Sequence, residues 1–134
     1  MADSRVQKFA KVLVEHSARI VPGDRVLIEA TTAAEPLVRE LFAQILERGG
    51  HPHPLISFPG QDESYLLHAN DSQLEFVPTF MKLAYDQFES RIRVHSSTNT
   101  RGLTNMDPAK LQKRGKAVSI ITATQMRRGA EGAF

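Results

Sequence analysis

The stretch that decides the fold is residues 21–57, VPGDRVLIEATTAAEPLVRELFAQILERGGHPHPLIS. It opens with a Pro-Gly-Asp turn, which is typical of a boundary between two secondary-structure elements. The continuous apolar run Val26, Leu27 and Ile28 follows, and such a run is typical of a strand buried on both faces. The strand is followed by a helical pattern and then by a second extended segment. This order predicts parallel strands joined by a right-handed crossover.

The helical pattern within this stretch carries its own start and stop signals. Pro36 suits a first helical turn, and two glycines close the pattern. Glu35 precedes Arg39 by four residues, which favours an ion pair on the helix surface. The second strand is predicted to begin only after its prolines, with its core at Leu55 and Ile56. The apolar face of the helix is predicted at Leu37, Leu41, Ile45 and Leu46.

Two further elements extend the pattern on either side. Asp3 or Ser4 is predicted to cap an N-terminal helix with apolar positions at helical spacing. Residues 88–94, FESRIRV, are predicted to form a third strand. In that strand apolar side chains alternate with arginines, which indicates one solvated face and an edge position. The spaced positions of the first helix are Val6, Phe9, Ala10, Leu13 and Ser17.

The remaining segments are predicted to be a loop and two helices. Residues 58–64, FPGQDES, are interpreted as a loop, and Asp71 as the cap of a helix that Pro78 bends or restarts. Asp107 and Pro108 then predict the start of a last helix. Its segment AVSIITAT is β-branched enough for a strand, but the preceding cap favours a helix continuing toward Arg128.

These elements predict an α/β fold: three layers, with a mainly parallel sheet and helices on both faces. Ligands of such sheets gather beyond the carboxyl ends of the strands. The segment EATTAAEP has no glycine-rich phosphate loop, so no nucleotide cofactor is expected. The polar residues at the strand ends are Glu29, Ser57 and Ser97, together with the four possible ligand-facing residues Thr31, Thr32, His95 and Ser96.

The histidines of GGHPHP raise the question of a metal site. His51 and His53 point to the same side of an extended segment, but zinc needs three or four ligands and nothing nearby completes the set. Each following proline pushes its histidine into extended geometry, so a structural role is favoured. Neither a pair of carboxylates placed for acid and base chemistry nor a nucleophilic serine motif appears in the sequence. We therefore assign this chain no metal ligand and no catalytic residue.

Composition and charge exclude several classes of protein. The chain of 134 residues contains no cysteine, which excludes disulfides and thiolate metal ligands. No apolar run has signal-peptide or membrane-spanning character, so a cytoplasmic protein without a membrane partner is expected.

Charge is distributed unevenly along the chain. Residues 1–90 carry 8 basic and 13 acidic side chains, whereas residues 91–134 carry 9 basic and 2 acidic. The only aromatic residue of the basic half is Phe134, whereas nucleic-acid binders interleave several aromatic side chains on which bases stack, so a solvated helix face or an acidic partner is favoured over nucleic acid. Its basic residues are Arg91, Arg93, Arg101, Lys110, Lys113, Arg114, Lys116, Arg127 and Arg128.

Residues 21–57, followed by ANDSQLEFVP and NMDPAKLQKR, resemble the N-terminal domain of the thermophilic-type metallo-aminopeptidases, peptidase family M29. The resemblance extends over nearly the whole chain. Its most specific parts are the Pro-Gly-Asp strand entry, the AEPLVREL helix and the GGHP exit. GGHPHP matches the second strand of that domain and not the metal site.

The resemblance implies that residues 1–134 are an incomplete N-terminal α/β domain of a longer aminopeptidase. In the family, two divalent metal ions of the zinc or cobalt type lie in the C-terminal half and activate water for attack on the first peptide bond. We expect this chain to be inactive alone, to wall the active-site chamber and to support a homodimer. The alternative is a self-standing α/β module that binds a small ligand at the polar strand ends.

Overall fold

The computed structural model describes residues 3–94 and 106–130. The chain divides into two compact units, which we call the sheet unit (residues 3–58 and 88–94) and the helical unit (residues 59–87 and 106–130). Among the helices of these residues, none combines the length and the apolar character needed to cross a membrane.

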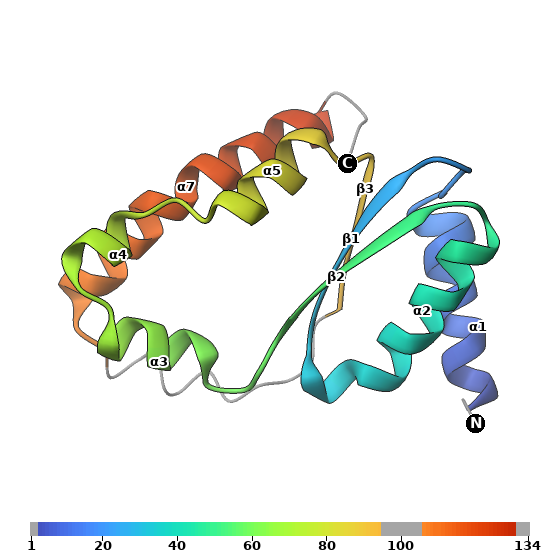
Figure 1. The fold of residues 1–134 in the computed structure, drawn as a ribbon, viewed down its shortest axis with the longest axis horizontal. Helices are drawn as coiled ribbons and strands as arrows, with labels where there is room; N and C mark the ends of the chain where they lie inside the picture. The colour runs from blue at the N-terminus through green and yellow to red at the C-terminus, as the bar shows by residue number, and fades with distance from the viewer. Residues whose placement is uncertain (1–2, 95–105, 131–134) are drawn as a thin grey trace. The chain divides into compact units, whose positions relative to one another are not determined.

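The sheet unit is built on three parallel strands (Figure 1). They are β1 (Arg25–Thr31), β2 (His51–Ser57) and β3 (Ser90–Arg93), in the order β2-β1-β3. Val26, Leu27 and Ile28 are fully buried in the central strand, as their apolar run predicted. The predicted edge position of the third strand is also confirmed. The structure is therefore α/β with a parallel sheet, the predicted class.

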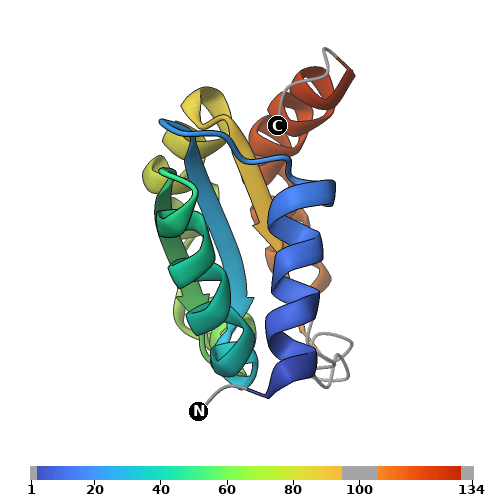
Figure 2. The ribbon, with the colours of Figure 1, turned by 90° about the vertical axis from the view of Figure 1, so that its right-hand side faces the viewer.

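Helices α1 (Ser4–Val12) and α2 (Glu35–Glu47) lie side by side over one face of this sheet (Figure 2). Asp3 caps α1 by accepting a hydrogen bond from the Arg5 amide, and the π-helical segment η1 (Leu13–Ser17) prolongs the helix. A short 3-10 segment, η2 (Thr32–Ala34), leads from β1 into α2. The core between sheet and helices contains Ala10, Val14, Ile20, Val26, Ile28, Ala30, Val38, Leu41, Ile45 and Ile92.

The apolar face of α2 differs from its prediction at one position. Leu41 and Ile45 are fully buried and Leu37 packs against the core, but Leu46 is 52% exposed. Val38 takes its place in the core, because residues three and four apart share one helix face and 38, 41 and 45 follow that spacing.

Strand β2 begins earlier than predicted. It includes both prolines because it is an edge strand with one unpaired side. The His51 amide donates to the Asp24 carbonyl at 2.7 Å. Because backbone groups alternate in direction along a strand, the nitrogen atoms of Pro52 and Pro54, which carry no hydrogen, face away from β1. The two prolines therefore remove no hydrogen bond between β2 and β1. The predicted core at Ile56 is also wrong, since this side chain is 41% exposed.

The helical unit contains α3 (Gln61–His68), α4 (Asp71–Glu75), α5 (Thr79–Gln87) and α7 (Pro108–Ala130). Helix α3 occupies part of the segment interpreted as a loop, so that interpretation is wrong from residue 61 onward. Asn70, not Asp71, caps α4 and forms a reciprocal capping box with Gln73. Pro78 lies between α4 and α5, which agrees with the predicted alternative that the helix restarts at this proline.

Helix α7 resolves the conflict in the last segment. Asp107 accepts a hydrogen bond from the Ala109 amide and caps the helix, and AVSIITAT continues as helix. Ser119, Thr122 and Thr124 direct their hydroxyls to carbonyls three or four residues earlier. These hydroxyls therefore bond within the helix, and Ala117, Ile121 and Thr124 form its buried positions.

Candidate functional site

Two of the four residues predicted to face a ligand line a cavity at the end of the central strand. Thr31 is the last residue of β1, and Thr32 is the first of η2. Both border a cavity of about 460 Å³ in the sheet unit, which we call the strand-end cavity. His95 and Ser96 lie outside the described residues. The structure thus places the two threonines together at the predicted edge of the sheet.

The strand-end cavity has an apolar wall supplied by α2 and β2. Val38 and Phe42 lie one turn apart on α2, while Pro54 and Ile56 lie two residues apart on β2. Residues at these spacings share one face of their helix or strand. Val38 is buried, but Phe42 is 39% exposed, so the wall keeps accessible apolar surface.

Charged side chains complete the lining of the cavity. The Glu35 Oε1 atom lies 3.3 Å from the Arg39 Nη2 atom, and both side chains are well exposed, at 65% and 77%. The sequence predicted this pair as a helix-surface interaction, yet nothing in the sequence connected it to Thr31. That connection comes from η2, which leads from the end of β1 directly into α2 and so brings both side chains to the same cavity as Thr31.

Other polar residues near the strand ends have structural partners. The Ser57 hydroxyl donates to the Ala30 carbonyl at 3.4 Å. Glu29 lies on the opposite face of the sheet from Ala30, and its carboxylate is 3.6 Å from the Arg91 guanidinium. Both side chains of this ion pair are largely buried. Ser57 and Glu29 are therefore used to hold the sheet together.

The histidines of GGHPHP have different surroundings. The His53 ring packs on Phe88 with 4.9 Å between ring centroids, and the Arg25 guanidinium lies 5.6 Å from the centroid of the same phenyl ring. Arg25 also binds Glu89 at 2.9 Å, and that hydrogen-bonded carboxylate raises the pKa of Arg25. His51 starts β2 and is exposed. His53 thus has a packing role at the amino ends of the strands.

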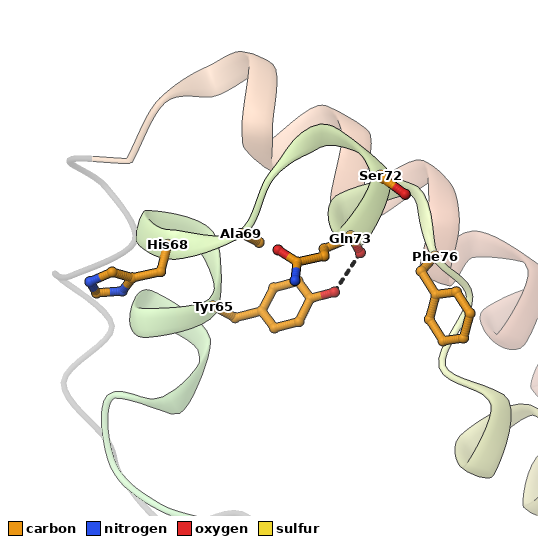
Figure 3. Close-up of a pocket in the computed structure, with 6 residues that line it drawn as sticks. All are labelled: Tyr65, His68, Ala69, Ser72, Gln73 and Phe76. Atoms are coloured by element: carbon orange, nitrogen blue, oxygen red, sulfur yellow. Dashed lines mark hydrogen bonds between the residues drawn. The ribbon is translucent and has the colours of Figure 1, made fainter.

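A second cavity, of about 450 Å³, lies in the helical unit between α3 and α4 (Figure 3). Its polar groups make bonds that shape the helix ends. The Tyr65 hydroxyl donates to the Gln73 carbonyl, the Gln73 side chain completes the α4 capping box, and the His68 Nδ1 atom lies 3.0 Å from the Ser64 carbonyl. This cavity is therefore a weaker candidate than the strand-end cavity.

The basic side chains of α7 serve the helical unit itself. Lys110 donates to the carbonyl of Leu67, Arg114 to that of Phe76 and Arg128 to that of Tyr85. These carbonyls belong to the last turn of α3, the C-cap of α4 and the last turn of α5. Cations are favourable at such positions because a helix carries partial negative charge at its carboxyl end. These three basic side chains thus have a structural role at helix ends within the helical unit.

Comparison with known proteins gives a family and a fold. A family model described as "Thermophilic metalloprotease (M29)" matches residues 2–134. The solved structure of wild-type AmpT from Thermus thermophilus is similar, with a TM-score of 0.77 and 19% sequence identity. The match covers 96% of this chain and 33% of that chain, so this chain spans about a third of the length of that protein. A comparison with curated proteins gives no match.

Proposed function

Because the chain belongs to the M29 family of thermophilic metalloproteases, we propose that it forms the N-terminal, non-catalytic part of an aminopeptidase acting on peptides. The observation that carries this proposal is the family match over residues 2–134, joined to a fold that corresponds to 33% of the AmpT chain. In the proposed enzyme this part walls the active-site chamber, restricts entry to peptide N-termini and supports a cytoplasmic homodimer.

The family implies metal ions, which we propose as two divalent ions held by other parts of the enzyme. Across residues 3–94 and 106–130, no three His, Asp or Glu side chains are grouped so that they could hold a metal ion. The described residues therefore do not fit a metal centre. We assign them no step of metal chemistry.

Assay of the purified 134-residue protein tests the proposal. With leucine p-nitroanilide and added Co²⁺ or Zn²⁺, we expect no release of nitroaniline above that of a heat-denatured sample, because the described residues hold no water-activating centre. Turnover that elutes with the protein in gel filtration and disappears with EDTA would overturn the non-catalytic assignment.

The second candidate function is a self-standing module that binds a small ligand. The strand-end cavity favours it, since Thr31 and Thr32 lie at the edge of the sheet where ligands of parallel sheets gather. This candidate and the first are not exclusive. A domain of a peptidase can also hold a ligand of its own.

A further inference from the structure

The strand-end cavity combines accessible apolar surface with one anion and one cation. Phe42 and Ile56 are 39% and 41% exposed, although both line a concave surface. Covering such surface with an apolar ligand group removes it from water and so favours binding. A volume of about 460 Å³ falls within the range of roughly 300–1,000 Å³ found for small-ligand pockets. The cavity is suited to an apolar group of side-chain size.

The charges narrow the class of ligand. Glu35 and Arg39 are held one turn apart on α2 and contact each other at 3.3 Å. Such an exposed ion pair contributes little to stability, so exchanging it for contacts with a ligand costs little. An adjacent carboxylate and guanidinium complement an ammonium and a carboxylate that are joined through one carbon atom. The guanidinium can bind a carboxylate through two parallel hydrogen bonds.

We propose that the strand-end cavity binds a free α-amino acid with a large apolar side chain. The ammonium group binds Glu35, the carboxylate binds Arg39, and the side chain covers Phe42 and Ile56. Thr32 also lines the cavity, and its hydroxyl can form a further hydrogen bond with the ligand. Binding at this site does not require peptidase activity, so its test is independent of the test of the proposed function.

Calorimetric titration with defined probes tests the ligand class. L-Leucine and L-phenylalanine are expected to bind at one site per chain. Glycine lacks the side chain, N-acetyl-leucine lacks the ammonium group and leucinamide lacks the carboxylate, so each is expected to bind at least about tenfold more weakly. Failure of both leucine and phenylalanine to bind would overturn the proposal. Equal binding of leucinamide would also overturn it, because the site would then accept a peptide N-terminus.

Variants test the location of the site. Glu35→Gln and Arg39→Gln change exposed side chains and are each expected to weaken leucine binding about tenfold or more. The matched control is Lys82→Gln, which removes an ion pair of the same spacing, Lys82 to Asp86 at 2.7 Å on α5. The control is expected to bind leucine like the parent protein. Binding unchanged by both cavity variants, or weakened equally by the control, would overturn the assignment to this cavity.

Discussion

At the scale of single residues, Gly50 shows how closely the entry to β2 is packed. A Cβ atom at this position would lie 2.9 Å from the Ile45 Cγ2 atom and 3.1 Å from the Ile20 Cγ2 atom. Both isoleucines are fully buried, so neither has room to move aside. Gly49 before it has a φ of +84°, a conformation that favours glycine. Glycine is therefore favoured at position 49 by the backbone conformation and at position 50 by the lack of space for a side chain.

The first prediction concerns this packing. Gly50→Ala is expected to lower the free energy of unfolding by about 1–3 kcal/mol, the usual cost of overpacking a filled core. The matched control is Gly115→Ala within α7, where an added Cβ meets no atom within 4 Å. That change is expected to stabilise the protein by about 0.5–1 kcal/mol through helix propensity. Thermal unfolding of both variants, followed by circular dichroism, measures the difference. A neutral Gly50→Ala variant would contradict the packing argument.

The sequence predicted the glycine pair as a helix end but could not supply the reason for Gly50. Helix termination is a local signal, readable from Gly49 and Gly50 themselves. The contact with Ile20 joins residues 30 positions apart and depends on the folded core. The same limit applies to the strand-end cavity: Thr31 and Thr32 were predicted from their place after a strand, but Phe42 and Ile56 join them only through tertiary packing.

At the scale of elements, the success of the predictions followed the strength of local signals. Helix α7 has an aspartate cap and a proline in its first turn, and these outweighed the β-branched content of AVSIITAT. Helix α3 was missed because Gly60 precedes it with a φ of +82° and no side-chain cap marks its start. Strand β2 was predicted too short because proline is unsuited to a central strand. In an edge strand, however, proline is tolerated at positions whose amide would face away from the neighbouring strand.

The ion pair between α4 and α7 gives a prediction for pH dependence. Asp71 lies 2.9 Å from Lys113, and this hydrogen-bonded ammonium lowers the pKa of Asp71. A carboxylate whose pKa is lowered by folding stabilises the folded state above its unfolded pKa of about 4, and this contribution is lost as the pH falls through the lowered value. The stability of Asp71→Asn is therefore expected to fall less steeply than that of the parent protein below about pH 4.

Thermal unfolding between pH 7 and pH 2.5 checks this expectation. Glu47→Gln is the control, because it removes an exposed carboxylate on α2, in the other compact unit. That variant should keep the steeper loss of stability due to Asp71. Identical pH profiles for Asp71→Asn and the parent protein would show that the contact with Lys113 contributes nothing measurable, as is often found for exposed pairs.

At the scale of the whole molecule, the two edges of the sheet differ in their capacity for further pairing. On β2, the outward positions 52 and 54 are prolines and offer no amide hydrogen. On β3, the Val94 amide donates to the Glu29 carbonyl at 2.8 Å, so by alternation Ile92 also faces β1 while Arg91 and Arg93 direct their amides outward. In the described sheet, the β3 edge is thus the one able to accept another strand.

The last prediction follows from this difference. We expect this chain to form a dimer or larger oligomer, either through the outer edge of the third strand or through AVSIITAT in a swapped or non-helical form. AVSIITAT lies within α7, which favours the β3 edge. Light scattering over a dilution series is expected to show concentration-dependent association. Arg93→Pro removes the outward amide and should shift the protein toward monomer, whereas Arg93→Ala keeps that amide and should not. A strict monomer at all concentrations would contradict self-association, and a dimer unaffected by Arg93→Pro would exclude pairing through β3.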